Sequence, residues 1–260
     1  MSIPKLLMVL PAYNEAENLR PLFASLESVF ERLARCGHDR AYVVVDDGSK
    51  DATPEILRDL QQRLPVTVIT HSPNQGLGPT IRDGLKMASE LAGDQDIVFA
   101  MDGDNSHPAG LMIRMTEMIL EGNDVVIASR YRPGAHIVGL AWHRKMMSTG
   151  ARLLFQLLFP IAGVRDYTCG YRAYRARLLK EAFRVYGDAF VEHQGFQCMA
   201  DILLRLGRLN AVMNEAPMIL RYDQKKGTSK MRVGRTVLNT LTLMLQRRFE
   251  KPPRRALDAK

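Results

Sequence analysis

Hydrophobic residues gather in short runs along the first half of the chain, and polar residues follow each run. The five runs span residues 6–10, 42–45, 66–69, 97–101 and 125–128. Their length and unbroken apolar character are typical of strands that are buried on both faces. The longer stretches that we predict as helices cover residues 15–34, 53–63, 78–91 and 109–121. This alternation predicts an α/β fold with a mostly parallel central sheet, right-handed crossovers and flanking helices.

The pattern changes in the second half of the chain. Helices are predicted at residues 144–159, 196–206 and 233–249, and polar loops at 166–172 and 223–230, with the stretch 218–222 before the second loop. We see no internal repeat and no long linker, and we expect the tail 251–260 to be disordered. The predicted organisation is one domain over residues 1–235, with halves 1–131 and 132–235, followed by a helix and basic tail over 236–260.

Composition adds limits to this picture. The chain has 260 residues, 46% hydrophobic and 25% charged, which is typical of a soluble globular protein with one large core. Cys36, Cys169 and Cys198 are widely spaced and form no CxxC pair, so we expect neither a disulfide framework nor a zinc site. We find no signal-peptide pattern and no apolar stretch of the about 20 residues that a spanning helix needs. These features favour the cytoplasm.

The net charge is +8, and it is concentrated in the C-terminal third of the chain. Fourteen lysines and arginines lie between Arg205 and Lys260, against only four acidic side chains. Basic surfaces bind anionic partners. The charge distribution therefore predicts contact with an anionic surface, either a membrane or a nucleic acid.

Candidate chemistry lies in the polar residues that follow the predicted strands. In open α/β sheets, ligands bind beyond the carboxyl ends of the strands. Asp102 and Asp104 flank Gly103 directly after the fourth run. Two carboxylates in this position suit Mg²⁺ or Mn²⁺ carrying a diphosphate, because hard cations prefer oxygen ligands. The alternative is a solvated turn, since Asp-Gly pairs are common in turns.

Two further segments can also be interpreted either as part of a binding site or as a purely structural turn. Residues 46–53 combine strand-end carboxylates with a helix N-cap at Asp51 or Thr53. These carboxylates either accept hydrogen bonds from a nucleoside or only close a capped turn. In residues 11–15, Asn14 or Glu15 opens a helix, while Tyr13 is placed to stack on a base.

The combination of motifs is more informative than any one of them. PAYNE (11–15), DDGS (46–49), NQGLG (74–78) and DGD (102–104) follow one another in this order. In this combination the sequence resembles family 2 glycosyltransferases over residues 5–235. It is most similar to the polyprenol-phosphate (dolichol-phosphate) mannosyltransferases, through MDGDNSHP (101–108), SRY (129–131), RK (144–145) with Ser148 and Gly150, DYTCGYR (166–172) and GTSKM (227–231).

The resemblance implies a nucleotide-diphospho-sugar transferase fold of the GT-A type. It also implies inverting transfer of a hexose from a GDP- or UDP-sugar to a polyprenyl phosphate, with mannose as the favoured hexose. Charge develops on the departing nucleoside diphosphate, and cations stabilise it. The acceptor phosphate is already anionic, so no strong general base is needed.

The resemblance carries over to individual residues as follows. Those implied to contact the nucleotide sugar are Pro11, Tyr13, Glu15, Val45, Asp47, Asp102, Gly103 and Gln224. Those implied to surround Mg²⁺ or Mn²⁺ are Asp102, Asp104 and Ser106. Catalytic roles are implied for Asp104, Arg130 and Lys230, and acceptor-phosphate contacts for Arg144 and Ser148.

Two positions depart from the family pattern and leave the sugar open. Gln224 stands where the relatives usually have arginine, and Met199 stands where they often have glutamate. One alternative is therefore a family 2 enzyme that uses UDP-glucose or another donor, or that acts on a hydroxyl. A hydroxyl acceptor needs a base, for which Asp166 and Asp201 are the candidates.

A second alternative is a non-catalytic protein that binds nucleic acid through its basic third. A polyanion binder gains nothing from carboxylates at strand ends, so we expect no nucleic-acid partner.

The last predicted helix has apolar residues at helical spacing among arginines. They are Val233, Val237, Leu241, Met244 and Leu245. This helix either lies in the interface of an anionic membrane or packs on its own domain. Residues 146–161 offer the same choice. Together with a lipid acceptor, these stretches predict peripheral contact at the cytoplasmic face of a membrane.

Overall fold

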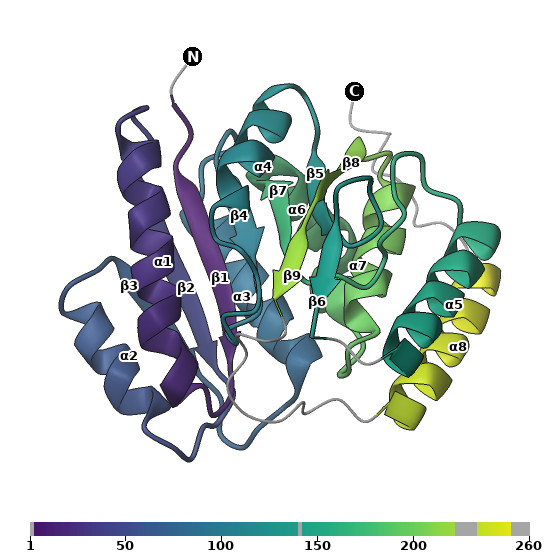
Figure 1. Ribbon diagram of the computed structural model, residues 1–260, viewed down its shortest axis with the longest axis horizontal. Helices are drawn as coiled ribbons and strands as arrows, with labels where there is room; N and C mark the ends of the chain where they lie inside the picture. The colour runs from purple at the N-terminus through teal and green to yellow at the C-terminus, as the bar shows by residue number, and fades with distance from the viewer. Residues whose placement is uncertain (1–2, 140–141, 222–232, 251–260) are drawn as a thin grey trace.

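The protein is described by a computed structural model that covers residues 3–139, 142–221 and 233–250. Its centre is a seven-stranded sheet with the strand order β3-β2-β1-β4-β7-β5-β8 (Figure 1). The strands are β1 (Leu6–Ala12), β2 (Arg40–Asp46), β3 (Val66–Thr70), β4 (Ile97–Ala100), β5 (Val125–Ser129), β7 (Arg172–Arg175) and β8 (Met213–Pro217). Neighbouring strands are parallel except around β7, which is antiparallel to both β4 and β5. The prediction of a mostly parallel sheet is confirmed.

Helices flank this sheet. They are α1 (Ala16–Ala34), α2 (Thr53–Gln61), α3 (Leu77–Leu91), α4 (Leu111–Leu120), α5 (Trp142–Leu158), α6 (Ala176–Tyr186), the 3-10 helix η1 (Gly187–Val191), α7 (Cys198–Arg208) and α8 (Val233–Phe249). Helix α3 packs on β1 and β2 and contacts α6 and α7, whereas α1 contacts α2 and α4. The five predicted strands and the four helices between them are all present. The stretch 218–222 contains β9 (Ile219–Arg221), which pairs with β6 (His136–Val138) in a separate two-stranded sheet.

The apolar runs form the inner strands because their side chains are covered on both faces. Val9, Val43 and Val98 on three neighbouring strands are all 0% exposed. Pairing in parallel register brings the last residues of β1 and β2 level, with Ala12 opposite Asp46. The polar residues that follow both strands therefore emerge at one edge of the sheet.

The sequence pattern did not predict β7 and β8, which contain charged residues. Arg172 in β7 is 0% exposed, and its guanidinium donates to the carbonyls of Met199 (2.7 Å) and Tyr167 (2.9 Å). Glu215 in β8 accepts hydrogen bonds from the backbone amides of Arg165 (2.6 Å) and Asp166 (2.5 Å). Met199, Arg165 and Asp166 come from remote segments, so the burial of the two charges depends on the tertiary fold.

Helix α8 packs on its own domain through an ion pair and two apolar side chains. Arg247 donates to both carboxylate oxygens of Asp201, from Nε at 2.5 Å and from Nη2 at 2.8 Å. Leu243 and Met244 are buried beside this pair. Arg205 and Arg208 also form ion pairs, with Glu192 and Glu250. Part of the basic charge predicted to meet an anionic surface is therefore neutralised within the fold.

The other face of α8 is open and apolar. Leu238, Leu245 and Phe249 are 65%, 65% and 82% exposed. Helix α5 lies beside α8 and exposes Leu153 and Leu157 to 57% and 78% (Figure 1). The buried face fits the interpretation that the last helix packs on its own domain, whereas contact of its exposed face with a membrane stays a prediction. Within the described residues, no helix has both the length and the hydrophobicity needed to cross a membrane.

Candidate active site

The loops after β1 and β2 are joined by direct hydrogen bonds. The backbone amide of Asp47 donates to the carbonyl of Ala12 (2.8 Å). The amides of Asn14 and Glu15 donate to the hydroxyls of Ser49 (2.9 Å) and Thr53 (2.9 Å). Because the amide of Glu15 lies at the start of α1, the second loop supplies an acceptor that the first turn of α1 lacks. The predicted convergence of these motifs at one edge is confirmed.

Asp47 organises the neighbouring loop with its carboxylate. The two oxygens accept hydrogen bonds from the amides of Gln75 (2.8 Å) and Gly76 (2.9 Å). One of them also lies 2.8 Å from Nδ1 of His71, whose Nε2 lies 3.0 Å from Asp83. The Asp47 side chain is thus committed to holding residues 71–76, and any contact with a nucleotide stays a prediction.

Other residues assigned to the nucleotide sugar lie around this loop. Val45 is 0% exposed in the core, so a ligand would meet its backbone rather than its side chain. Tyr13 and Glu15 are half-buried at the edge of the sheet. The Glu15 carboxylate accepts a hydrogen bond from Asn18 (2.6 Å). Tyr13 and Glu15 are therefore placed where a ligand beyond the carboxyl ends of β1 and β2 would lie.

The Asp102-Gly103-Asp104 turn packs closely against the end of β1. A Cβ atom on Gly103 would lie 2.7 Å from the carbonyl oxygen of Pro11, so only glycine fits. Asp104 is 7% exposed, and its Oδ1 accepts hydrogen bonds from the amide (3.1 Å) and hydroxyl (2.6 Å) of Ser106. Ser106 therefore fixes the orientation of this carboxylate.

Asp102 is half-buried and lies against the loop that precedes β7. A Cβ atom on Gly170 would lie 3.0 Å from Oδ1 of Asp102, so the glycine makes room for the carboxylate. In the described part of the chain, no three His, Cys, Asp or Glu side chains are grouped to hold a metal ion. A pair of carboxylates suits Mg²⁺ or Mn²⁺ when the substrate phosphates and water complete the coordination. Asp102 and Asp104 fit such an ion.

Arg130 follows β5 at the same edge and is clamped by Asp166. Its Nε and Nη2 donate to the two carboxylate oxygens at 2.8 Å and 2.6 Å, and Nη2 also donates to the hydroxyl of Thr168 (2.6 Å). Burial alone would raise the pKa of Asp166, but the guanidinium outweighs it and the pKa lies below its usual value. Asp166 is therefore ionised and holds Arg130 in place. The phosphate contact of Arg130 stays a prediction.

Neither of the two predicted bases is placed to act on a hydroxyl acceptor. Asp166 and Asp201 are both 0% exposed, and each is paired with an arginine. Their structural roles could not be read from the sequence, because their partners lie 36 and 46 residues away. Burial also raises the pKa of the Cys169 and Cys198 thiols to about 12, so neither serves as a nucleophile at neutral pH. All three cysteines are free.

The remaining predicted site residues divide into two groups. Ser148 lies on α5, and its hydroxyl is hydrogen-bonded to that of Tyr131, which follows Arg130. The structure thus brings the predicted acceptor-phosphate residue Ser148 to the end of β5. Gln224, Lys230 and the side chain of Arg144 lie outside the described residues.

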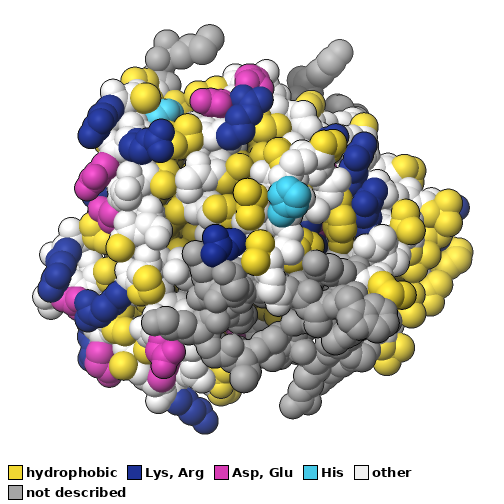
Figure 2. All heavy atoms as spheres, viewed as in Figure 1, with side chains coloured by type: hydrophobic (Ala, Val, Ile, Leu, Met, Phe, Trp, Pro, Cys, Tyr) yellow, Lys and Arg dark blue, Asp and Glu magenta, His cyan; other side chains and the backbone are white. Residues whose placement is uncertain are grey.

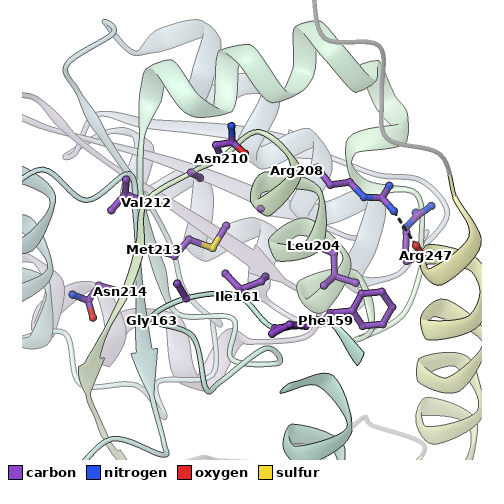
Figure 3. A pocket seen from close by; sticks show the side chains of 14 residues that line it. Phe159, Ile161, Gly163, Leu204, Arg208, Asn210, Val212, Met213, Asn214 and Arg247 are labelled. Atoms are coloured by element: carbon purple, nitrogen blue, oxygen red, sulfur yellow. Dashed lines mark hydrogen bonds between the residues drawn. The ribbon is translucent and has the colours of Figure 1, made fainter. Parts of the chain in front are cut away.

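A cavity of about 630 Å³ lies away from this edge, between the end of α5, α7, the start of β8 and α8 (Figure 3). Phe159, Ile161, Leu204 and Met213 provide apolar lining, and Arg208 and Arg247 lie at one end. Met213 begins β8, which runs parallel to β5, so the cavity is at the opposite end of the strands. None of the predicted site residues that the structure describes lines it.

A family model, several relatives and several solved structures are similar to this chain. Residues 8–183 match the model of the family described as "Glycosyl transferase family 2". An undecaprenyl-phosphate mannosyltransferase from Micrococcus luteus is 31% identical over 250 residues, which are 95% of this chain and 96% of the relative. A dolichol-phosphate mannosyltransferase from Pyrococcus furiosus is 30% identical over 91% of this chain, but the match spans only 62% of that relative.

Among solved structures, the chain is similar to glucosyl-3-phosphoglycerate synthase from Mycobacterium tuberculosis, crystallised with Mn²⁺, UDP and phosphoglyceric acid. The TM-score is 0.64 at 19% identity, over 95% of this chain and 80% of the synthase. At this identity the similarity supports the GT-A type of fold and nothing finer.

Proposed function

Since the chain belongs to glycosyl transferase family 2, we propose that it transfers mannose from a nucleotide-diphosphate sugar to a polyprenyl phosphate, with inversion at the anomeric carbon. The names of the relatives from Micrococcus luteus and Pyrococcus furiosus support this donor sugar and this class of acceptor. The proposed donor is a GDP-sugar or a UDP-sugar.

The observation that carries the proposal is the convergence of two kinds of group at one sheet edge. The carboxylates of Asp102 and Asp104 lie after β4, and the clamped Arg130 lies after β5. The loop 166–170 connects them, because Asp166 binds Arg130 while Gly170 lies against Asp102. A donor diphosphate and an acceptor phosphate would thus meet between an acidic and a basic part of the same edge.

The residues of this edge account for the chemistry without a general base. The acceptor phosphate oxygen is ionised at neutral pH and attacks the anomeric carbon as the bond to the nucleoside diphosphate breaks. Asp102 and Asp104 would hold a divalent ion, with Ser106 orienting Asp104. A divalent ion there stabilises the charge that develops on the leaving diphosphate. Arg130 and Lys230 are proposed to bind phosphate oxygens.

The structure gives little support to a hydroxyl acceptor. That reaction needs a base within hydrogen-bonding reach of the acceptor. Asp166 and Asp201 are both fully buried in ion pairs. A family 2 enzyme that uses UDP-glucose stays the alternative, because Gln224 and Met199 differ from the usual residues of the mannosyltransferases.

One assay tests the proposal. The purified protein is incubated with GDP-mannose, UDP-glucose or other nucleotide sugars, a polyprenyl phosphate, and Mg²⁺ or Mn²⁺, and the product is identified by mass spectrometry. We expect a mannosyl lipid phosphate that forms only with a divalent cation and disappears with a chelator. Transfer to a free polyprenol, but not to its phosphate, would overturn the proposed acceptor.

We further propose that the apolar face of α5 and α8 rests on the cytoplasmic surface of a membrane. Hydrophobic side chains gather over these two helices at one side of the molecule (Figure 2). On α5 and α8 the exposed apolar residues, which are 43–82% exposed, include Met146, Leu153, Leu157, Leu238, Leu241, Leu245 and Phe249. A lipid acceptor makes a bilayer the partner that fits this face. The free cysteines support the cytoplasmic side.

Charging this face should weaken membrane binding. We expect the double substitution Leu245→Asp and Phe249→Asp to lower the affinity for vesicles that contain anionic lipid by about 10-fold or more, because two exposed apolar groups leave the interface. Vesicle cosedimentation measures the effect. Leu120→Asp on α4 is the matched control, since Leu120 is 55% exposed but lies outside this face. Equal binding by both variants would show that α8 does not contact the membrane.

A further inference from the structure

Tyr131 joins the end of β5 to helix α5. Its hydroxyl is hydrogen-bonded to that of Ser148 on α5. The guanidinium carbon of Arg130 lies 5.5 Å from the centre of the Tyr131 ring, and that of Arg152 lies 4.8 Å from it. Both distances are within the range of cation–π contacts. One tyrosine ring thus holds two guanidinium groups and a serine hydroxyl together.

The two arginines differ in how their charges are balanced. Arg130 is paired with the carboxylate of Asp166 at 2.6 Å. Arg152 forms no ion pair with any residue that the structure describes, and its Nε donates to the side-chain oxygen of Gln156 at 3.2 Å. Arg152 is partly exposed. Its charge is therefore available for an anion at this place, beside that of Arg130.

The helix places these groups next to the apolar face. Residues 148 and 152 are one turn apart and so lie on the same side of α5. Met146, Leu153 and Leu157, at 63%, 57% and 78% exposure, form a neighbouring stripe at helical spacing. A ligand whose phosphate lies at Ser148 and Arg152 would have its hydrocarbon chain beside Met146, Leu153 and Leu157.

We propose that Arg152 and Tyr131 are part of the site for the acceptor phosphate, with Arg152 binding the phosphate oxygens and Tyr131 positioning Arg152 and Ser148. This inference rests on the proposed function and adds two residues to it. The ligand is the phosphate monoester of a long isoprenoid. Burial raises the pKa of the Tyr131 phenol, so the hydroxyl stays protonated and can donate to Ser148 or to the phosphate.

Kinetics with both substrates test the role of Arg152. We expect Arg152→Met to raise the KM for polyprenyl phosphate by about 10- to 100-fold, since a charge-assisted hydrogen bond to phosphate is lost. The KM for the nucleotide sugar should stay unchanged. Arg152→Lys should recover part of the loss, because it restores the charge without the planar guanidinium. Arg177→Met is the matched control, since Arg177 on α6 is 59% exposed and paired with Asp124.

The role of Tyr131 is separated by two substitutions. Tyr131→Phe keeps the ring that holds Arg152 but loses the hydrogen bond to Ser148, so it should raise the acceptor KM less than Tyr131→Leu, which should approach the effect of Arg152→Met. An unchanged acceptor KM in Arg152→Met, or an equal rise in both KM values, would overturn the inference.

A binding measurement distinguishes failure of this inference from failure of the proposed function. If the wild-type protein forms no mannosyl lipid phosphate, calorimetry with a short-chain isoprenyl phosphate still compares the variants. Weaker binding by Arg152→Met than by Arg177→Met supports the phosphate site, and equal binding rejects it.

Discussion

Replacing Asp102 by asparagine is expected to lower the rate of hexose transfer by at least about 100-fold, with the fold preserved. Asp102 is half-buried at the end of β4, and a Cβ atom on Gly170 would lie only 3.0 Å from its Oδ1. Asparagine has nearly the same size, so the packing against Gly170 is kept. The amide lacks the charge that holds a divalent ion beside the donor diphosphate. Initial rates across a range of Mg²⁺ or Mn²⁺ concentrations measure the loss.

Asp94→Asn is the matched control for this experiment. Asp94 lies three residues before β4, is 69% exposed and pairs with Lys180 at the surface. We expect this variant to keep the wild-type rate. A thermal unfolding curve checks that Asp102→Asn is folded. If Asp102→Asn retained the full metal-stimulated rate, the assignment of this carboxylate to the metal and diphosphate would be wrong.

The second large effect is expected at Asp166, and it concerns the stability of the fold. Its carboxylate is 0% exposed and accepts hydrogen bonds from the Arg130 guanidinium and from the backbone amides of Arg130 (3.0 Å) and Cys169 (3.1 Å). Asp166→Asn leaves the Arg130 cation without its counter-charge. Removing one partner of a buried pair costs about 3–5 kcal/mol, and we expect that loss in the free energy of unfolding.

Urea unfolding followed by circular dichroism measures this loss. Asp188→Asn is the control, because Asp188 pairs with Lys86 at the surface with 67% of its side chain exposed. An exposed pair contributes less than about 1 kcal/mol. A loss of less than about 1 kcal/mol in the free energy of unfolding of Asp166→Asn would show that Arg130 is held by other contacts.

The pH dependence of stability provides a separate check on Asp166. Its pKa is depressed in the folded protein, since burial is outweighed by the charge of Arg130. The group therefore adds stability above its unfolded pKa of about 4, and this contribution is lost as the pH falls through the lower folded value. We expect the difference in unfolding free energy between the wild type and Asp166→Asn to be constant near neutral pH and to shrink below about pH 4. A constant difference down to strongly acidic pH would contradict the ion pair.

Several features could be predicted because their signals are local. Strands β1 to β5 are continuous apolar runs, and such runs become buried strands wherever a sheet forms. The ends of parallel strands must share an edge, so the convergence of the motifs around Asp47 and Asp102 followed from the strand assignments alone. The amphipathic helix 233–249 was predicted with the bounds of α8. The sequence also shows that this helix has apolar residues at helical spacing among arginines.

Other features could not be predicted because they depend on partners far along the chain. Arg172 makes β7 look like a polar loop until Met199 and Tyr167 supply carbonyl acceptors in the core. Asp166 and Asp201 look like candidate bases until their arginines are known. A buried charge is stable only with its counter-charge and hydrogen bonds, and the sequence pattern does not show which residues provide them.

By itself, the sequence determined the α/β class, the parallel first half of the sheet and the presence of an acidic pair after the fourth strand. These depend on hydrophobic periodicity and on neighbouring residues. Only the tertiary structure decided that Asp47 holds a loop, that Asp166 clamps Arg130, and that Tyr131 brings α5 to the site. Those roles arise from contacts across 17 to 36 residues, where distance and burial determine whether a polar side chain stabilises the fold or faces a ligand.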